Sequence, residues 1–376
     1  MKNFNLLQII PSLDSGGAEQ GTVDVANFIG EKDLGSFIVS NGGKMLTLLN
    51  KKKTGHFKLP IHSKNIFSLP FVANKLSKII SDKHINIVHI RSRFPAWCLQ
   101  IIRNKKFKTA STFHNVYGSQ NLFKKIYNKA LSRVDHIVAI SDFVKSTIIN
   151  TYKINENKIT VINRGVDTKF FNAKVNNDNN FIDFLDKYNL SSEKKIILYP
   201  GRLTEWKGQI NFLKIMESYN DDQIICYFVG DDKNISYASK LTREINKRNL
   251  QQNCKIIGHL SKEDLRMMYI CADLVISAPL RPEGFGRVIS ESLAMKKIIL
   301  CYDYGGAKDQ LSGLDKIYKI SPYDQEEMKN KIDKIIKLSN SHKDYLGSIS
   351  RRHVIENFSK EKMLEGYLNF YQDTVL

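Results

Sequence analysis

The sequence predicts an α/β protein with two doubly wound domains, each a parallel sheet covered by helices. Short apolar runs alternate with amphipathic stretches of about 10–15 residues, and this alternation occurs twice along the chain. A length of 376 residues suits two domains, and an apolar content of 42% provides a core for each. We expect a first domain at 1–170, a polar, Asn-rich linker at 171–194 and a second domain at 195–376.

The first domain is expected to begin with a strand at 4–11 and a helix from Ala18 to about Gly30. Alternating elements follow this pair. The further strands are expected at Phe37–Ser40, Ile87–Ile90, Lys108–Phe113, His136–Ile140 and Ile159–Ile162. The further helices are expected at 72–82, 95–103, 120–132 and 142–151.

The second domain repeats the alternation, and the chain from Pro322 onward is expected to be mostly helical, with a last helix that packs back on the first domain. Because ligands of such folds bind beyond the carboxyl ends of the strands, the loops that follow strands are the candidate sites. The strands are expected at Lys195–Tyr199, Ile224–Val229, Lys255–Ile257, Leu274–Ser277 and Ile298–Cys301. The helices are expected at 207–217, 235–248, 261–271 and 287–296.

The net charge of +19 is concentrated in one half of the chain. Residues 1–174 contain 27 Lys and Arg against 10 Asp and Glu, whereas residues 175–376 contain 30 against 28. A basic surface attracts nucleic acid, anionic lipid or a phosphorylated substrate. No helix-turn-helix, RNP-type strand or zinc pattern accompanies the charge, so we expect no nucleic-acid partner. The alternative is a Lys-biased composition that serves only solubility.

Cysteine usage and hydropathy indicate a reduced, cytoplasmic protein. Five cysteines are scattered without a CxxC pair, so neither a disulfide framework nor a zinc site is expected. No apolar stretch approaches the ~20 residues of a spanning helix, and the N-terminus lacks a signal-peptide pattern. The cysteines are Cys98, Cys226, Cys254, Cys271 and Cys301.

The segment around Glu283 and Glu291 is the strongest candidate site. The strand Leu274–Ser277 leads into a loop, and a helix begins near Gly286, where free backbone N–H groups can bind a pyrophosphate. Gly284 and Gly286 leave room for close approach of a ligand. Glu283 can reach a sugar hydroxyl from the loop, and Glu291 can chelate a ribose diol from the helix. The alternative is a surface loop with two solvated glutamates.

The segment Arg281-Pro-Glu-Gly-Phe-Gly-Arg-Val-Ile-Ser-Glu291 resembles the E-x7-E motif of the large retaining glycosyltransferase family 4. The segment Leu198-Tyr-Pro-Gly-Arg-Leu-Thr-Glu-Trp-Lys-Gly208 is similar to that family's G-R-L-x-x-x-K-G loop. The resemblance implies the GT-B fold, two Rossmann-like domains facing an interdomain cleft. It also implies that Arg202 and Lys207 hold the donor diphosphate.

Motifs of the first half extend the resemblance. Ser15-Gly-Gly-Ala-Glu19 resembles the family's Gly-rich loop, and His114 is placed like its active-site histidine near the C6 hydroxyl of the donor sugar. Asn163-Arg-Gly-Val-Asp167 resembles the N-G-V-D turn, to which we assign a structural role. Arg164 is a departure from that motif or an insertion in it, because the family usually has Gly directly after the Asn.

In the second half, Gly305-Gly306-Ala307 resembles the family's G-G-A loop, with Asp309 in place of the usual Glu. We expect no cofactor and no metal ion. A D-x-D-like metal site at Asp231-Asp232 is an alternative, although adjacent aspartates rarely bind one metal together.

The resemblance implies catalytic roles for His114, Arg202, Lys207 and Glu283. It implies donor binding by Gly16, Gly17, Gly201, Arg202, Lys207, Glu283, Gly284, Phe285, Gly286, Arg287, Val288 and Glu291.

The function implied is that of a retaining hexosyltransferase. It would move a sugar from a UDP- or GDP-linked donor to a hydroxyl of a lipid-linked or cell-envelope glycan, such as lipopolysaccharide or a related polysaccharide. Retention would follow from front-face attack, with the leaving phosphate taking the acceptor's proton; the alternative makes Glu283 a nucleophile. Two other functions stay open: a nucleotide-sugar 2-epimerase of the same fold, and a non-catalytic polyanion-binding protein.

The stretch Asn121–Arg133 is basic and amphipathic at helical spacing. Such a helix can lie in the interface of an anionic membrane, which predicts a peripheral position on the cytoplasmic face. The alternative is a helix packed on its sheet. The apolar face is formed by Leu122, Phe123, Ile126, Tyr127, Ala130 and Leu131. The membrane- or acceptor-binding cations are Lys124, Lys125, Lys129 and Arg133.

Overall fold

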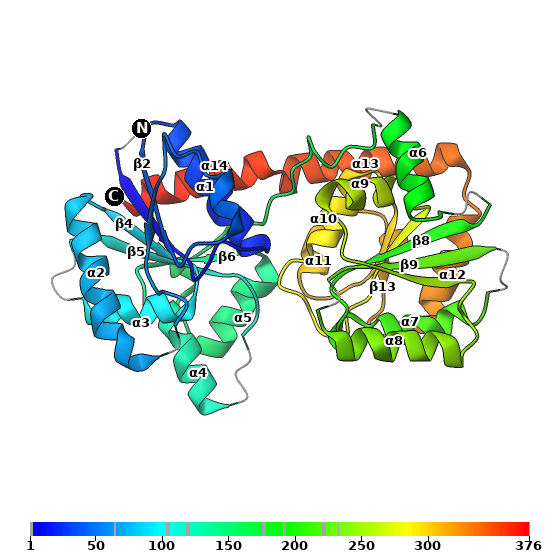
Figure 1. Cartoon of the computed structure of the whole chain (residues 1–376), viewed down its shortest axis with the longest axis horizontal. Coiled ribbons are helices and arrows are strands. Elements are labelled where there is room, and N and C mark those ends of the chain that lie inside the picture. The colour runs from blue at the N-terminus through cyan, green and yellow to red at the C-terminus, as the bar shows by residue number, and fades with distance from the viewer. Residues whose placement is uncertain are drawn as a thin grey trace. The chain divides into compact units, whose positions relative to one another are not determined.

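A computed structural model describes residues 3–63, 65–102, 106–117, 121–174, 178–190, 193–219, 223–231 and 233–375. The chain forms two compact units (Figure 1). The first unit contains 1–165 together with 360–376, and the second contains 166–359. The first unit thus ends before the expected boundary at 170, and it includes the C-terminal helix.

The sheet of the first unit is fully parallel, with the strand order β3-β2-β1-β4-β5-β6-β7. Strands β1 and β4 are made largely of buried apolar residues, as expected for a sheet covered on both faces. Strand β3 was not predicted from the sequence. The strands are β1 (Asn5–Ile9), β2 (Gly35–Ser40), β3 (Gly55–Lys58), β4 (Ile87–Ile90), β5 (Lys108–Phe113), β6 (His136–Ala139) and β7 (Ile159–Val161).

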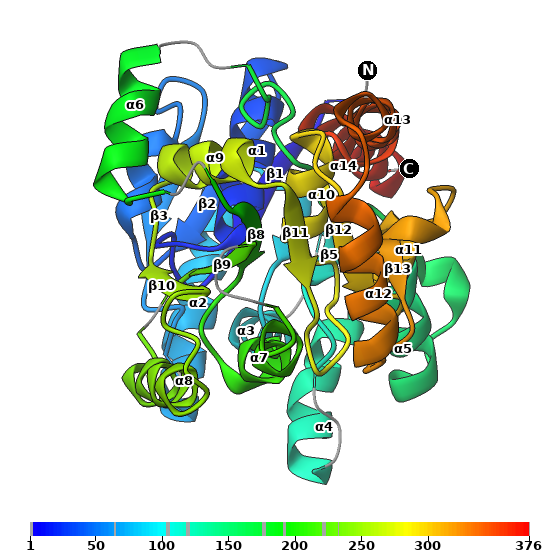
Figure 2. The same ribbon diagram turned by 90° about the vertical axis from the view of Figure 1, so that its right-hand side faces the viewer.

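Helices α1 and α14 lie side by side on one face of this sheet, and α2 and α3 cover the other (Figure 1). Helix α4 extends away from the sheet (Figures 1 and 2). The helices are α1 (Gly17–Glu31), α2 (Leu69–Asp82), α3 (Arg93–Ile101), α4 (Leu122–Lys129), α5 (Asp142–Tyr152) and α14 (Lys360–Thr374). The short 3-10 turns are η1 (Lys44–Leu48), η2 (Ile66–Ser68), η3 (Ala130–Ser132) and η4 (Glu156–Lys158).

A buried polar network fastens α14 to the first sheet. Tyr371 Oη lies 2.6 Å from His89 Nδ1, and His89 Nε2 lies 2.7 Å from Thr112 Oγ1. Arg91 donates to Tyr367 Oη at 3.2 Å. Each of these polar groups finds a partner inside the protein, so the network stabilises the attachment of the last helix.

The sheet of the second unit is also parallel, with the order β10-β9-β8-β11-β12-β13. Its strand β9, which lies between β10 and β8, is buried at every position. Strand β13 was not predicted from the sequence. The strands are β8 (Lys195–Pro200), β9 (Ile224–Val229), β10 (Cys254–Gly258), β11 (Leu274–Ser277), β12 (Ile299–Tyr302) and β13 (Lys319–Ile320).

Helices α7 and α8 lie on one side of the second sheet and α9 on the other (Figure 2). Helix α13 packs on α10. The helices are α6 (Asp178–Lys187), α7 (Gln209–Met216), α8 (Ile235–Lys247), α9 (Lys262–Cys271), α10 (Arg287–Ala294), α11 (Gly306–Gln310), α12 (Gln325–Ile336) and α13 (Asn340–Phe358). The 3-10 turns are η5 (Glu205–Lys207) and η6 (Lys316–Tyr318).

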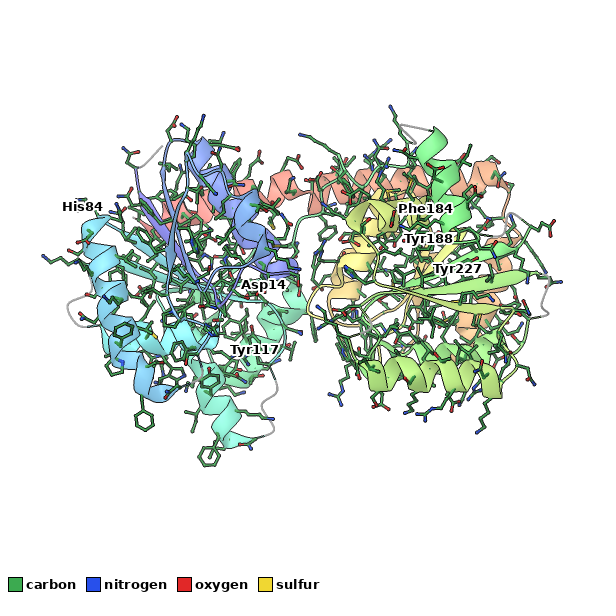
Figure 3. All side chains as sticks on the ribbon, in the orientation of Figure 1. Asp14, His84, Tyr117, Phe184, Tyr188 and Tyr227 are labelled. Carbon is green, nitrogen blue, oxygen red and sulfur yellow. The ribbon has the colours of Figure 1, made fainter. Side chains whose placement is uncertain are left out.

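Helix α6 occupies part of the region where the sequence predicts a linker. Its Phe184 is buried and packs on Tyr188 with 5.0 Å between ring centroids (Figure 3). Tyr188 and Lys187 both donate to Asp264 of α9, at 2.8 and 3.0 Å. The Asn-rich composition concealed this helix, because its stability comes from contacts with α9 rather than from helix propensity.

Each of the two sheets has one point at which the order of its strands reverses direction. In the first sheet β1 lies between β2 and β4, and in the second sheet β8 lies between β9 and β11. Crevices at such points, outside the carboxyl ends of the strands, are where open α/β sheets bind ligands. The loops after β1 and β4, and after β8 and β11, are therefore the places to examine.

Candidate active site

The loop after β8 places Lys207 at the reversal point of the second sheet. Gly208 has a φ of +81°, and a Cβ there would lie 2.4 Å from the carbonyl oxygen of Ala278 in the loop after β11. Only glycine allows the two loops to approach so closely. Arg202 is exposed, and its side chain has no hydrogen-bond partner among the residues that the structure describes. Gly201 lies directly before it, with a φ of +151°.

Lys207 and Glu283 form an ion pair between these two loops. Lys207 Nζ lies 2.6 Å from Glu283 Oε1, and the two side chains are only 12% and 17% exposed. The Lys207 ammonium also lies 4.7 Å from the centre of the Trp206 ring. The sequence predicted both charged residues at the site, and the structure brings them together.

Three tyrosine hydroxyls contact the carbonyls of the two loops that carry Lys207 and Glu283. Tyr304 donates to the Pro279 carbonyl, and Tyr323 donates to that of Leu280 at 3.2 Å. Tyr199 donates to the Lys207 carbonyl at 2.7 Å, and its hydroxyl also lies 3.4 Å from the Ala278 carbonyl oxygen. Burial raises the pKa of Tyr199 and Tyr304, so their hydroxyls stay protonated and able to donate. These tyrosines were missed at the sequence level, since no motif connects them to these loops.

The Gly305-Gly306 turn after β12 supports the loop that carries Glu283 from its other side. The N–H of Gly306 donates to the Glu283 carbonyl at 2.9 Å, and a Cβ on Gly306 would lie 2.6 Å from the Gly284 carbonyl oxygen. Gln310 donates to the Gly286 carbonyl at 3.2 Å and to that of Phe285. Gln310 is a positioning residue that sequence reasoning missed.

Helix α10 begins directly after Gly286, whose conformation is left-handed. The Gly286 cap offers no side chain to the first N–H groups of the helix, which leaves them open to an anion. Glu283 Oε2 lies 3.6 Å from the position of a Cβ on Gly286, so the ion pair and the helix start adjoin. Val288 is partly exposed in the first turn.

Glu291 is buried inside α10 with two partners of its own. Tyr269 donates to its Oε2 at 3.2 Å, and Arg287, whose side chain is 44% exposed, donates to its Oε1 at 2.9 Å. Phe285 is buried and packs on Phe358, so its ring supports the loop from the inside. The sequence placed Phe285 among the donor-binding residues, and its ring lies in the core of the second unit.

The first unit gathers its predicted residues at the carboxyl edge of its sheet. Gly16, with a φ of +132°, caps α1, and His114 follows β5. Arg164, after β7, donates to the Gly17 carbonyl and lies 2.8 Å from His114 Nδ1. The sequence predicted Gly16, Gly17 and His114 near one another, but assigned Arg164 only to a turn.

Helix α4 exposes its apolar side chains, which disagrees with the alternative of a helix packed on its sheet. It is shorter than predicted, and Leu122, Phe123, Ile126 and Tyr127 are 69%, 83%, 45% and 38% exposed. Ala130 and Leu131 are buried in the turn η3 that follows.

Three of the four expected cations lie on α4, and the fourth lies beyond it in the chain. Lys124, Lys125 and Lys129 lie on α4. Arg133 lies past η3, where it donates to Gln100 at 3.1 Å and lies 5.7 Å from the centre of the Trp97 ring. The first unit as a whole contains 27 Lys and Arg against 12 Asp and Glu. Within the described residues, no helix is long and apolar enough to cross a membrane.

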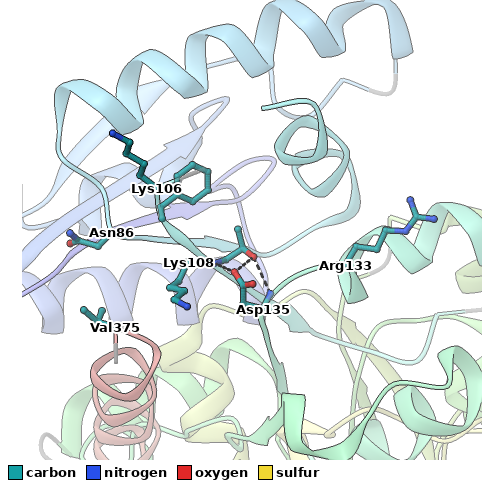
Figure 4. A pocket seen from close by; sticks show the side chains of 8 residues that line it. Asn86, Lys106, Lys108, Arg133, Asp135 and Val375 are labelled. Atoms are coloured by element: carbon teal, nitrogen blue, oxygen red, sulfur yellow. Dashed lines mark hydrogen bonds between the residues drawn. The ribbon is translucent and has the colours of Figure 1, made fainter. Parts of the chain in front are cut away.

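A pocket of about 540 Å³ opens at the opposite edge of the first sheet (Figure 4). Lys106, Lys108 and Arg133 line it, and Asp135 accepts hydrogen bonds from Thr109 there at 2.7 and 2.8 Å. This pocket lies at the amino ends of the strands, whereas the motif residues lie at the carboxyl ends. We therefore do not include it in the candidate site.

The suspected metal site after β9 is only partly described, because Asp232 lies outside the described residues. Asp231 accepts a hydrogen bond from the backbone N–H of Lys233 at 2.9 Å. In the part of the chain that the structure describes, no three His, Cys, Asp or Glu residues group in a way that could hold a metal ion.

Comparison with known proteins gives matches over both units. Residues 15–170 match the family described as Glycosyltransferase Family 4, and residues 181–353 match Glycosyl transferases group 1. The crystal structure of a glycosyltransferase from Rickettsia africae ESF-5 is 32% identical, with a TM-score of 0.89 over 100% of this chain and 99% of that one.

Two more distant proteins are similar over most of the chain. Anabaena Alr3699/HepE, crystallised with UDP-glucose, is 17% identical with a TM-score of 0.81 over 99% of this chain and 100% of its own. The capsular polysaccharide biosynthesis glycosyltransferase CapH of Staphylococcus aureus is 24% identical over 69% of this chain and 70% of its own. The GT-B fold and the family predicted from the motifs are confirmed.

Because the backbone approaches Gly208 closely, we expect a substitution there to be more destabilising than the same substitution at an open glycine. Gly208→Ala and Gly313→Ala replace glycines of nearly equal φ, +81° and +82°, but a Cβ at Gly313 meets nothing within 4 Å. Both substitutions carry the strain of a left-handed alanine. We expect Gly208→Ala to lower the free energy of unfolding of the second unit by a further ~1–3 kcal/mol, because its Cβ overlaps the Ala278 carbonyl. Urea denaturation measures the difference, and equal losses would contradict the packing described.

Proposed function

The chain belongs to the group 1 and family 4 glycosyltransferases of GT-B fold, and from this premise we propose which sugar-transfer reaction it performs. It transfers a hexose from a nucleoside-diphosphate donor to a hydroxyl of a lipid-linked or cell-envelope glycan, with retention at the anomeric carbon. The observation that carries the donor half is the Lys207–Glu283 pair beside the start of α10. The crystallised HepE with UDP-glucose and the capsular enzyme CapH support the donor and acceptor classes.

The proposed diphosphate site combines two cations with a helix end. Lys207 exchanges its contact with Glu283 for a phosphate oxygen, and the exposed Arg202 contributes a second positive charge. The free N–H groups at the start of α10 bind the same anion. Glu283, released from Lys207, accepts a hydrogen bond from a sugar hydroxyl. These fixed charges need little reorganisation when the donor bond breaks.

Glu291 is proposed to hold the ribose. Its buried carboxylate is oriented by Tyr269, while the exposed Arg287 can move off the other oxygen. Gly201, Gly284 and Gly286 allow the donor to approach the backbone, and Gly16 and Gly17 do the same in the first unit. Tyr269 is therefore added to the residues proposed from the sequence.

The proposed reaction breaks the bond between the anomeric carbon and the diphosphate oxygen and forms a bond to the acceptor oxygen on the same face. The acceptor's proton passes to the departing diphosphate. Negative charge grows on that leaving group, and Lys207, Arg202 and the α10 start oppose it. Their charges supply what a metal ion supplies in other phosphate-handling enzymes, so the proposal includes no metal and no cofactor.

The first unit is proposed to bind the acceptor and an anionic membrane surface. The exposed apolar side chains of α4 lie on a helix with Lys124, Lys125 and Lys129, in a unit with a large excess of positive charge. Apolar side chains can enter the headgroup boundary while lysines contact anionic lipids. This arrangement supports a peripheral position on the cytoplasmic face of a membrane.

A thermal-shift panel of UDP, GDP and their sugars tests the donor site. We expect one nucleotide series to raise the Tm of the second unit by about 5 °C or more at ~100-fold excess over Kd. Lys207→Met and Glu291→Gln should abolish the shift, whereas Arg243→Gln, an exposed arginine on α8, should preserve it. A wild type that no nucleotide stabilises would contradict the donor site. Conversion of the donor without an acceptor would identify an epimerase instead of a transferase.

Sedimentation with vesicles tests the membrane surface. The double substitution Leu122→Ser and Phe123→Ser should weaken binding to vesicles that contain anionic lipid by about tenfold or more, because two exposed apolar side chains no longer insert. Ile235→Ser, at a 75% exposed position in the second unit, is the matched control and should not change binding. Binding that is indifferent to anionic lipid and to the α4 variants would refute the proposal.

A further inference from the structure

Arg164 connects three segments at the carboxyl edge of the first sheet. It follows β7, yet its guanidinium donates to the Gly17 carbonyl after β1 and lies 2.8 Å from His114 Nδ1 after β5. The family 4 motif has no arginine here, and its Gly-Val-Asp is present in this chain as Gly165-Val166-Asp167. The departure from the motif therefore adds a contact to the residue expected to meet the donor sugar.

The contact determines which nitrogen of His114 bears the proton. A guanidinium has five N–H donors and no acceptor, so Nδ1 must be the acceptor in this hydrogen bond. In a neutral imidazole the proton then lies on Nε2. His114 is partly buried as a residue, and its Nε2 is buried and has no hydrogen-bond partner among the described residues. A buried N–H without a partner is unfavourable unless a ligand supplies an acceptor.

The charged surroundings of His114 also favour the neutral ring. Burial, followed by the positive charges of Arg164 and Arg91 and by His89, lowers the pKa of His114 well below its usual value. Tyr117, which donates no charge to this cluster, is itself buried, which raises its pKa and keeps it neutral. The carboxylate of Glu19 interacts with Arg164, and burial raises the pKa of Glu19.

We propose that Arg164 is a positioning residue that holds His114 as the Nε2–H tautomer, so that the imidazole meets the donor sugar as a hydrogen-bond donor and not as a base. The ligand group that it recognises is an oxygen with a free lone pair, such as a sugar hydroxyl. This inference rests on the proposed function for the identity of the ligand, but not for the state of the ring.

Arginine suits this role better than lysine. Its planar fork can donate to the Gly17 carbonyl and to His114 Nδ1 at once, in fixed directions. A lysine ammonium could donate to Nδ1, but its flexible stem would not fix both contacts together. The Gly-rich loop, which α1 follows, and the histidine are thus held in one arrangement by a single side chain.

Nitrogen NMR of the protein labelled with ¹⁵N-histidine tests the proposal without any substrate. His114→Gln assigns the His114 resonances among the nine histidines. We expect the wild type to show protonated Nε2 and unprotonated Nδ1 across about pH 6–8, the range in which exposed imidazoles titrate. Arg164→Met should raise the pKa of His114 and admit the other tautomer, and Arg164→Lys should retain Nε2–H. Lys78→Met, which removes an exposed cation from α2, is the control and should leave the spectrum unchanged.

A double-mutant cycle on transfer then tests whether Arg164 acts through His114. Arg164→Met should lower kcat/KM about threefold to tenfold in the wild-type background, the loss expected for one hydrogen bond. In the His114→Gln background it should lower kcat/KM little further. Additive losses, or a wild-type ring that is charged or protonated on Nδ1, would overturn the proposal. If Arg164→Met does not fold, the wild-type and Arg164→Lys spectra still decide the tautomer. Absence of any transfer would refute the proposed function and leave the NMR result to judge Arg164.

Discussion

The ion pair between Lys207 and Glu283 is the contact on which the second unit's site depends. Two opposite charges lie 2.6 Å apart, with little exposure to water, where the loops after β8 and β11 meet. Removing charges from water is unfavourable, so such a pair is kept only when its surroundings fix the geometry. Gly208, the three tyrosines and the Gly305-Gly306 turn do this. In the proposed function, Lys207 exchanges this carboxylate partner for a diphosphate bound at the start of α10.

Much of this arrangement was predictable from the sequence, because its elements are local. Strands β4, β5, β9 and β11 were predicted at their observed bounds, since short apolar runs end at polar loops. The contacts between distant segments were not predictable. Lys207 and Glu283 are 76 residues apart, and the reach of Arg164 to His114 spans 50. Contacts between residues so far apart in the chain produce no pattern in local residue spacing or periodicity. Helix α6 was mistaken for a linker because its Asn-rich composition hides contacts made in tertiary structure.

The two units differ in net charge, and different functional groups are proposed for each. The second unit has nearly balanced charge and carries the groups proposed to oppose negative charge on the leaving diphosphate. The first unit carries most of the excess positive charge, an exposed amphipathic helix, and a histidine whose hydrogen bonding is set by Arg164. Each unit presents its functional residues at the carboxyl edge of a parallel sheet, whereas α4 lies after β5 and extends away from that sheet. His114, proposed to contact the sugar, and α4, proposed to contact the membrane, therefore both lie in the segment that follows β5.

The most direct test of the central claim is a crystal structure of the wild-type protein with a bound nucleoside diphosphate. We expect the diphosphate to lie at the start of α10, Lys207 Nζ to contact a phosphate oxygen instead of Glu283 Oε1, and the ribose hydroxyls to contact Glu291. A diphosphate bound elsewhere, or one that leaves the Lys207–Glu283 pair intact, would contradict that claim.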